Sequence, residues 1–386
     1  MKTGFVQKNL VLVVMVALLM SSCTGVFNEG PGPSGGCDWS MFGQSPSHNS
    51  SVHGTCGPQT SDLIKKWAFA TKGPITSSCA FENGKCFFGC FDKNLYCIDS
   101  IEGSLIWKHE TGGTVGSPAV SGGYVCFASQ DKKLYCLSSA TGETVWEIEG
   151  TQNFSSPTIY QSKIYYASID RNVYCVDLSS GQEAWRFETK GPIGSSVTVV
   201  NDRAYVGSND YNVYCLNAKN GNELWSFKTD NAVVSTPSVW GDRVFFGSYD
   251  DKIYCLNATT GEKIWEFKTG GDIVSTPSVY IDRLIVGSNA GVVYCVSIED
   301  GKELWSFDPG LWVPIPSTPA IAGTKMFVGS ADKNVYLIDT ITGKKLWHFE
   351  TSDRIFASPA VYKNRVYIGS ADGKLYCFED KAATGK

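Results

Sequence analysis

Hydrophobic residues along the chain recur in short blocks, without the spacing of an amphipathic helix. In STPSVWGDRVFFGSYDDKIYCLNATTGEKIWEFKT (235–269), four runs rich in valine, isoleucine, tyrosine and phenylalanine are separated by GD, DD and ATTGE. β-branched and aromatic residues favour strands, whereas glycine, asparagine and aspartate favour the turns between them. The pattern predicts four short β-strands in this stretch.

The same unit recurs along the chain. Its outer strand is marked by a tryptophan at steps of 39 to 42 residues: Trp67, Trp107, Trp146, Trp185, Trp225, Trp265, Trp305 and Trp347. Tyrosines recur at nearly the same steps, at Tyr96, Tyr135, Tyr174, Tyr214, Tyr254, Tyr294, Tyr336 and Tyr376. Four strands in a repeat of about 40 residues are typical of a β-propeller. We therefore predict an all-β fold, an eight-bladed β-propeller of four-stranded blades.

The first and last units are incomplete in complementary ways. DLIKKWAFAT (62–71) supplies an outer strand with no inner strands before it, and KLYCFEDKAATGK (374–386) ends the last unit after its third strand. Joined, ATGK and LIKKW are similar to ITGKKLW (341–347). We expect the N-terminal strand to complete the C-terminal blade, because this pairs two strand edges that would otherwise be open.

These repeats resemble those of the pyrroloquinoline-quinone (PQQ) repeat family. RVYIGSADGKLYCFED (365–380) and KMFVGSADKNVYLIDTITGKKLW (325–347) match the family pattern, and the match extends over residues 62–386. DWSMFGQSPSHN (38–49) is similar to the arm that precedes the first blade in that family. The resemblance implies that each of the eight repeat tryptophans docks on a neighbouring blade, near a glycine such as Gly261 or Gly301.

The family contains two classes of protein, so the resemblance implies two different functions. One class comprises periplasmic alcohol and sugar dehydrogenases, which use PQQ and calcium and need calcium-binding carboxylates, a catalytic acid in an inserted loop and usually an adjacent cysteine pair. The other comprises cofactor-free scaffolds such as the lipoprotein of the outer-membrane β-barrel assembly machinery. This chain has no adjacent cysteine pair, no CxxCH and no long insertion. We favour the scaffold and keep the PQQ-dependent dehydrogenase as the alternative.

The N-terminus predicts export and a lipid anchor. Residues 1–22 join a lysine-bearing start to the apolar run Leu10–Met20, which is too short to span a bilayer and is typical of a signal peptide. Met20–Cys23 resembles a lipobox, which would make Cys23 the lipidated residue; the alternative is an ordinary signal peptide cleaved beside a cysteine. We interpret residues 23–36 as a tether and 37–61 as an arm. The predicted location is the extracytoplasmic side of a membrane, the outer membrane if the cell has one.

The charge of the chain argues against nucleic acid as a partner. The formal net charge is −5, and removing residues 1–22, which hold two lysines and no acid, gives −5 − 2 = −7. Binding to phosphates requires a concentrated cationic face, and no basic cluster is present. The predicted partners are proteins of the cell envelope and, through the anchor, a membrane surface. We expect the propeller to be monomeric.

Of the fourteen cysteines, nine fall into two groups, while Cys79, Cys86, Cys90 and Cys126 lie in predicted strands of the first two blades. Seven follow a repeat tyrosine: Cys97, Cys136, Cys175, Cys215, Cys255, Cys295 and Cys377. We interpret these as small buried residues, because packed sheets lie about 10 Å apart whereas a disulfide needs Cα atoms within about 7 Å. Cys37 and Cys56 flank the arm and either form a disulfide or remain free thiols. No catalytic residue and no set of metal ligands can be assigned.

Acidic residues at one end of the repeats are a weak candidate for a cation site. Aspartate occupies the predicted turn between the second and third strands at Asp92, Asp131, Asp170, Asp210, Asp250, Asp332 and Asp372, with Asn289 in the eighth place. Hard cations prefer several oxygen ligands, but such turns also favour Asp and Asn for their own geometry. We favour the role in the turn.

The step of 42 residues marks a candidate binding loop. The extra residues fall in DPGLWVPIPSTP (308–319), where Trp312 is flanked by prolines. We predict Trp312 as a contact anchor for a protein partner, with Phe154, Arg354 and Phe356 in neighbouring loops on the same face. The alternative is that Trp312 closes the channel mouth. The loops also carry Lys190, Asp230 and Asp272, and a sugar or small ligand at the channel mouth is a further alternative.

Overall fold

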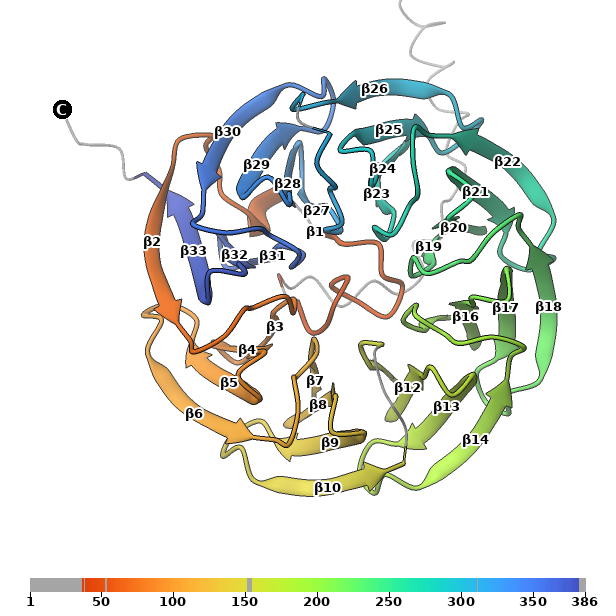
Figure 1. The fold of residues 1–386 in the computed structure, drawn as a ribbon, viewed down its shortest axis with the longest axis horizontal. Coiled ribbons are helices and arrows are strands. Elements are labelled where there is room, and N and C mark those ends of the chain that lie inside the picture. Colours follow the sequence, from red (N-terminus) through yellow and green to blue (C-terminus); the bar gives the residue numbers. More distant parts are fainter. Residues whose placement is uncertain (1–36, 38, 53, 151–154, 311, 382–386) are drawn as a thin grey trace, which may run out of the picture. The chain divides into compact units, whose positions relative to one another are not determined.

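The computed structural model describes residues 37, 39–52, 54–150, 155–310 and 312–381. Eight sheets surround a central axis (Figure 1), which confirms the predicted eight-bladed propeller. The only helix in these ranges is a 3-10 turn, η1 (Gly54–Cys56), and none of their helices is long and apolar enough to cross a membrane. The predicted leader, the tether and Cys23 lie outside the described residues, as does Phe154.

Each blade runs from an inner strand A to an outer strand D. The A strands are β3 (Ala80–Glu82), β7 (Ala119–Ser121), β11 (Thr158–Tyr160), β15 (Thr198–Val200), β19 (Ser238–Trp240), β23 (Ser278–Tyr280), β27 (Ala320–Ala322) and β31 (Ala360–Tyr362). The B strands are β4 (Lys85–Gly89), β8 (Tyr124–Ser129), β12 (Lys163–Ala167), β16 (Arg203–Gly207), β20 (Arg243–Gly247), β24 (Arg283–Gly287), β28 (Lys325–Gly329) and β32 (Arg365–Gly369).

The C and D strands complete the blades. The C strands are β5 (Asn94–Asp99), β9 (Lys133–Ser138), β13 (Asn172–Asp177), β17 (Asn212–Asn217), β21 (Lys252–Asn257), β25 (Val293–Ser297), β29 (Asn334–Asp339) and β33 (Lys374–Asp380). The D strands are β6 (Leu105–Glu110), β10 (Thr144–Glu149), β14 (Glu183–Glu188), β18 (Glu223–Lys228), β22 (Lys263–Lys268), β26 (Glu303–Phe307), β30 (Lys345–Glu350) and β2 (Leu63–Ala70).

Burial explains the two hydrophobic patterns of the sequence. The B and C strands lie inside each blade, have neighbouring blades on both faces, and are buried along almost their whole length, as in β20 and β21. Such strands are continuous hydrophobic runs. The D strands form the outer rim, and their exposure alternates, as in β18. The continuous hydrophobic blocks of a repeat are therefore its inner B and C strands, and the alternating stretch is its outer D strand.

The ring closes as the sequence predicts. β2 pairs antiparallel with β33, with Leu63 opposite Asp380 and Ala70 opposite Lys374. The carboxylate of Asp380 accepts hydrogen bonds from the backbone N–H groups of Gln59 (2.6 Å) and Thr60 (2.8 Å), which hold the incoming chain against the last strand. The two ends of the chain thereby form one blade.

Seven of the eight tryptophans of the repeat pack on a glycine of the next blade. The glycines share a left-handed backbone, and a Cβ on any of them would lie within 2.8 Å of an indole carbon: Gly103, Gly142, Gly181, Gly221, Gly261, Gly301 and Gly343. Six indoles also donate to a carbonyl of that blade, as Trp225 does to Ala258. The Nε1 of Trp107 has no acceptor among the described residues. The ring of Trp347 contacts that of Phe378.

The arm lies across the central channel and bonds to the inner strands (Figure 1). Six inner strands donate a backbone N–H to an arm carbonyl at 2.7–3.3 Å: Phe81 to Trp39, Val120 to Ser40, Val199 to Pro46, Val239 to Ser47, Val279 to Asn49 and Ile321 to Ser50. In the last blade, Asn364 donates to Cys56. β1 (Ser51–Val52) pairs parallel with β27, so one blade has five strands and not the four expected. The difference arises because the arm satisfies hydrogen bonds that an inner edge strand leaves open.

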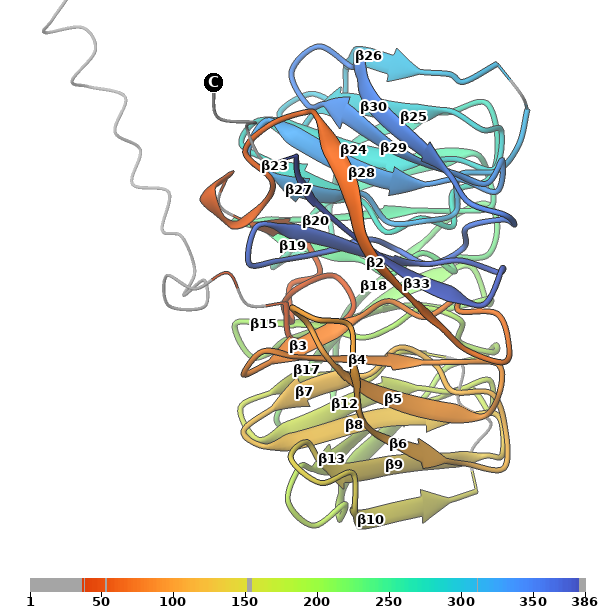
Figure 2. The same cartoon turned by 90° about the vertical axis from the view of Figure 1, so that its left-hand side faces the viewer.

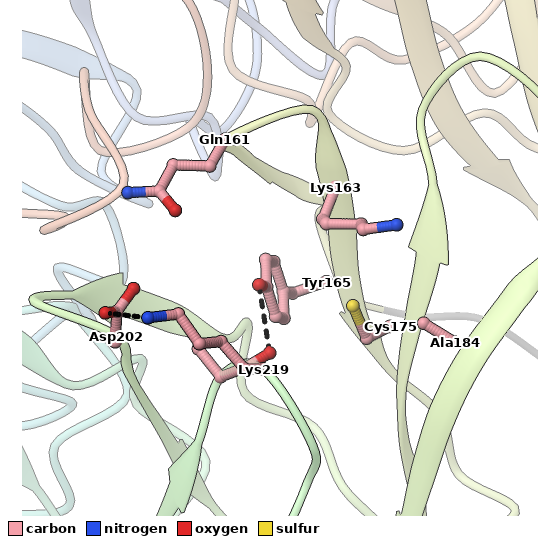
Figure 3. Close-up of a pocket in the computed structure, with 8 residues that line it drawn as sticks. Gln161, Lys163, Tyr165, Cys175, Ala184, Asp202 and Lys219 are labelled. Atoms are coloured by element: carbon pink, nitrogen blue, oxygen red, sulfur yellow. Dashed lines mark hydrogen bonds and ion pairs between the residues drawn. The ribbon is translucent and has the colours of Figure 1, made fainter.

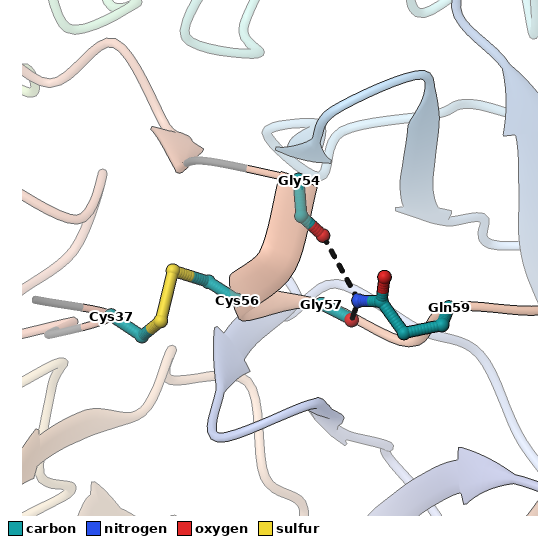
Figure 4. The surroundings of a disulfide bond; sticks show 5 residues. All are labelled: Cys37, Gly54, Cys56, Gly57 and Gln59. Atoms are coloured by element: carbon teal, nitrogen blue, oxygen red, sulfur yellow. Dashed lines mark hydrogen bonds between the residues drawn. A yellow bond between two sulfur atoms is a disulfide. The ribbon is translucent and has the colours of Figure 1, made fainter.

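A disulfide closes the arm into a loop. Cys37 and Cys56 are bridged, with their Cα atoms 5.1 Å apart (Figure 4). Beside the bridge, the side-chain amide of Gln59 donates to the carbonyls of Gly54 and Gly57, which holds the chain as it leaves η1. Of the two states that the sequence leaves open for these cysteines, the structure has the bridged one.

His48 connects the arm to the remaining blade. Its Nε2 lies 3.0 Å from the Oγ1 of Thr158 in β11. The hydroxyl of Thr158 donates its own proton to the carbonyl of Val197, so it accepts a proton from Nε2. Burial lowers the pKa of His48 to about 4, although hydrogen bonds to the backbone oppose the shift. The imidazole is therefore neutral at pH 7, and the arm contacts all eight blades.

The packing of indole on glycine predicts the effect of a methyl group. We expect Gly261→Ala to lower the free energy of unfolding by about 3 kcal/mol, because a Cβ there would lie 2.7 Å from Trp225. Gly241→Ala is the matched control: Gly241 is also left-handed but has no atom within 4 Å, so only backbone strain of about 1 kcal/mol remains. Urea unfolding measures both, and equal losses would contradict the role of the indole.

The buried imidazole predicts a pH dependence of stability. A histidine in the unfolded chain has a pKa near 6.5, so the stability contributed by neutral His48 is complete above that pH and is lost as the pH falls toward 4. We expect the free energy of unfolding to fall between pH 7 and pH 5 by about 2 kcal/mol more in the wild type than in His48→Gln. Urea titrations at the two pH values measure this, and equal slopes in both proteins would disprove it.

Candidate binding face

The propeller has two different faces. In an antiparallel blade, the A–B turn and the C–D loop lie at one end, and the B–C turn lies at the other end with the connection from strand D to the next strand A. The arm lies on the first face, whereas the arrows of β10 and β26 point toward the second (Figure 2). We call the second the B–C face. It carries Trp312, Arg354 and Phe356.

The B–C turns carry a repeated pair of aspartate and tyrosine. One carboxylate oxygen accepts the tyrosine hydroxyl at 2.6–2.9 Å in seven blades: Asp92 and Tyr96, Asp131 and Tyr135, Asp170 and Tyr174, Asp210 and Tyr214, Asp250 and Tyr254, Asp332 and Tyr336, and Asp372 and Tyr376. The other oxygen accepts the backbone N–H two residues on, as from Asn212 to Asp210 at 3.0 Å. These carboxylates are engaged in the turns, as favoured from the sequence. In the sixth blade the equivalent residue is Ala290, four positions before Tyr294, and not Asn289 as expected.

The same aspartates fix the connections between blades. The carboxylate of Asp210 also accepts the backbone N–H of Lys190 at 2.8 Å, and that of Asp250 accepts the N–H of Asp230 at 3.1 Å. Burial raises the pKa of Asp92, but the hydrogen bonds that it accepts outweigh burial and lower its pKa overall. The result is a face on which hydrogen bonds to ionised carboxylates hold the loops in place.

Trp312 is the most exposed large hydrophobic side chain of the described residues, at 84%. Its neighbours are anchored: the carbonyl of Pro314 accepts the N–H of Ala331, Ile315 is fully buried, and the backbone of Val313 lies where a Cβ on Gly291 would be. Trp312 itself has φ = 50°, a strained conformation for a residue other than glycine. The indole points into solvent.

The other predicted residues lie around this loop. Phe356 is 42% exposed in the next connection, beside fully buried Ile355, and Arg354 is exposed. Asp230 is exposed and forms an ion pair with Lys252 at 3.1 Å. Burial, and then the charge of Asp251, raises the pKa of Asp272. No described contact joins the side chains of Trp312, Arg354 and Phe356, so they share a face but not a compact site.

Sequence reasoning missed three exposed aromatic residues on the B–C face. Phe91, Tyr211 and Tyr249 lie in B–C turns of the first, fourth and fifth blades. Most other blades have a small or polar residue at the corresponding positions, such as Asn209 and Ala371. An aromatic residue that replaces a small one at a turn position is the sequence signal that could have found them.

The inter-blade argument on cysteines also missed one contact. All seven repeat cysteines are buried. The distance between sheets argues against a disulfide between repeat cysteines of different blades, but it does not apply to two cysteines within one blade. The Sγ of Cys136 lies 3.2 Å from that of Cys126, and both are in the second blade.

Comparison with known proteins identifies the family. The family model described as outer membrane protein assembly factor BamB matches residues 64–169, 92–190, 169–276 and 237–386, which together cover most of the chain. The chain belongs to this family. No curated protein sequence matches it.

Solved structures show the same fold in members of both functional classes. BamB from Moraxella catarrhalis has a TM-score of 0.73 at 18% identity, covering 82% of this chain and 99% of that one. Quinohemoprotein alcohol dehydrogenase from Comamonas testosteroni has a TM-score of 0.76 at 14% identity, covering 90% and 82%. A computationally designed protein, Ika8, has a TM-score of 0.73 at 19% identity, covering 80% and 97%. These likenesses show the fold alone.

The described residues of this BamB-family chain do not fit PQQ and calcium. In seven connections between blades, the residue that follows the last buried apolar residue is mostly glycine or apolar: Thr76, Gly116, Gly194, Val234, Val274, Pro316 and Phe356. The nearby aspartates are engaged with tyrosines, and no group of three histidine, cysteine or acidic residues in the described ranges could hold a metal ion. A calcium site requires several free oxygen ligands.

A small cavity of about 170 Å³ between the third and fourth blades is a packing gap (Figure 3). In three other blades the first residue of strand B donates to carbonyls of the next blade, as Arg365 does to Ile101 at 2.9 Å. Lys163 instead pairs with Asp177 at 3.2 Å, and Lys219 is paired with Asp202. Burial raises the pKa of Cys175 in its wall to about 11, so the thiol is protonated. Both lysines of its lining are thus paired with aspartates, and the hydroxyl of Tyr165 donates to the carbonyl of Ala218, so few polar groups there are left for a ligand.

Proposed function

We propose that this chain is a non-enzymatic scaffold of the cell envelope, which binds a protein partner through its B–C face. Trp312 carries the proposal, because a strained loop presents its indole to solvent while the flanking residues are anchored. Tryptophan and tyrosine are enriched among the residues that dominate protein interfaces. A rigid surface loses little conformational entropy on binding, which favours affinity.

The location and the partner class rest on the family and the N-terminus. The family description names an outer-membrane assembly factor, so the proposed partner is a protein of that assembly process. Lipidation at Cys23 would hold the propeller at the membrane surface where such a partner lies. Membership of the family is compatible with a protein that performs no reaction. Sequence identity does not decide the matter, because BamB and the dehydrogenase are similarly distant from this chain, at 18% and 14%.

The remaining candidates are a PQQ-dependent dehydrogenase and a receptor for a sugar or small ligand. The fold is compatible with a PQQ-dependent dehydrogenase, but the described residues do not supply the ligands that PQQ and calcium need. The second would use the channel mouth, but the connections on the B–C face carry mostly apolar and glycine residues there, which offer few partners for sugar hydroxyls. Neither is supported as well as the scaffold.

An activity assay separates the scaffold from the dehydrogenase. We expect no turnover when the purified protein, incubated with PQQ and calcium, is given primary alcohols or aldose sugars and an electron-accepting dye. The reason is that no group of three histidine, cysteine or acidic residues among the described residues could hold the ion. Dye reduction that requires both PQQ and substrate would overturn the proposed function.

A pull-down tests the role of Trp312. We expect Trp312→Ala to weaken capture of the partner from solubilised envelopes by about 30-fold, since truncating a central aromatic anchor costs about 2 kcal/mol. Ile281→Ala is the matched control, because Ile281 is 62% exposed but lies in an A–B turn on the opposite face. Circular dichroism confirms that both variants fold.

The outcomes are distinct. Loss of capture in Trp312→Ala but not in Ile281→Ala supports binding through the B–C face. Equal capture by the wild type and Trp312→Ala would remove that loop from the interface. Loss only in Ile281→Ala would move the interface to the face that carries the arm.

A further inference from the structure

One blade contains two cysteines directly opposite each other. Cys126 in β8 and Cys136 in β9 are register partners, and their Sγ atoms are 3.2 Å apart. Directly opposite residues of an antiparallel pair project to the same face of the sheet. Their Cα atoms lie about 4.5 or 5.5 Å apart, depending on the type of pair, and both values fall within the range that a disulfide spans.

This arrangement occurs only in the second blade. In the other blades, the residue opposite the one that follows the repeat tyrosine is large. These pairs are Phe87 and Cys97, Tyr165 and Cys175, Tyr205 and Cys215, Phe245 and Cys255, Ile285 and Cys295, Phe327 and Leu337, and Tyr367 and Cys377. The second blade thus replaces a large side chain by a second thiol, directly opposite the thiol of the repeat cysteine.

We propose that Cys126 and Cys136 form a second disulfide, joining strands β8 and β9. The sulfur atoms need to approach by only about 1 Å to reach bonding distance, which side-chain rotation can supply. The bond joins residues ten positions apart, so it forms within a local hairpin.

The reaction is thiol–disulfide exchange with a disulfide oxidant such as glutathione disulfide. The thiolate of one cysteine attacks a sulfur of the oxidant and releases one glutathione thiolate. The second cysteine thiolate attacks the protein sulfur of the mixed disulfide and releases the other. In sum, two protein thiols are oxidised to one disulfide, and one glutathione disulfide is reduced to two glutathione thiols, which take up the two protons.

Because both thiols are buried in the folded protein, the oxidation must occur before the blades pack. Both cysteines are fully buried in the core between the second and third blades, together with Met41 of the arm. Burial, and then the contact with Cys136, raises the pKa of Cys126, which disfavours the attacking thiolate in the folded protein. The hairpin is therefore oxidised while the chain folds, and the finished propeller shields the bond from reductants.

Peptide mapping tests the bond on the full chain. The protein is reduced, unfolded and refolded in a mixture of glutathione and glutathione disulfide, and the folded monomer is isolated by gel filtration. It is then alkylated under denaturing conditions and digested with trypsin. Cleavage after Lys108, Lys132, Lys133 and Lys163 places Cys126 alone in peptide 109–132 and Cys136 alone in peptide 134–163.

The expected result is a linked pair of these two peptides, without alkyl label, that separates on reduction. Cys175, in peptide 172–186, is the matched control, because it occupies the same repeat position but faces Tyr165; it should be fully alkylated. In Cys126→Ala, Cys136 should become alkylated like Cys175. Alkylation of both Cys126 and Cys136 as complete as that of Cys175 would overturn the proposal, as would linkage of either to a different cysteine.

Discussion

The contact between the indole of one blade and a glycine turn of the next sets the spacing of the ring. The glycine is required twice, because its backbone is left-handed and because the indole occupies the position of a Cβ. The indole N–H donates to a carbonyl of the same turn in six blades, so the contact fixes orientation as well as distance. Small deviations would accumulate around eight blades, and the ring could not then close on β2 and β33.

The fold could be predicted from the sequence because its period is encoded in large, distinctive side chains. Trp67 could be assigned to the last blade because that blade lacks an outer strand, and β2 does pair with β33. The course of the arm could not be predicted in the same way. Seven of its contacts are backbone hydrogen bonds, which almost any sequence can make, so residues such as Pro46 and Ser47 carry no pattern that names their partners.

The candidate binding face was predictable where it breaks the repeat. Trp312 stands in the connection that is longer than the others, and its exposure agrees with a role in contact. Tyr211 and Tyr249 do not change the length of their turns, so a search for irregular spacing passes over them. Cys126 was missed for a related reason: its significance appears only when the register of β8 and β9 places it opposite Cys136. Side chains at regular positions thus need the structure before their chemistry can be judged.

The arm has a consequence for how this protein can evolve. Propellers gain and lose blades by duplication and deletion of whole repeats, a change that leaves the contacts between neighbouring blades intact. Here, seven carbonyls and one imidazole, spaced along residues 39–56, each match one blade. A ninth blade would have an inner strand without a partner in the arm. In a ring of seven blades, one contact group of the arm would have no blade to bind, and the groups beside it would no longer lie opposite their strands. Because the arm makes one such contact with each blade, it favours a ring of eight blades over a ring of seven or nine.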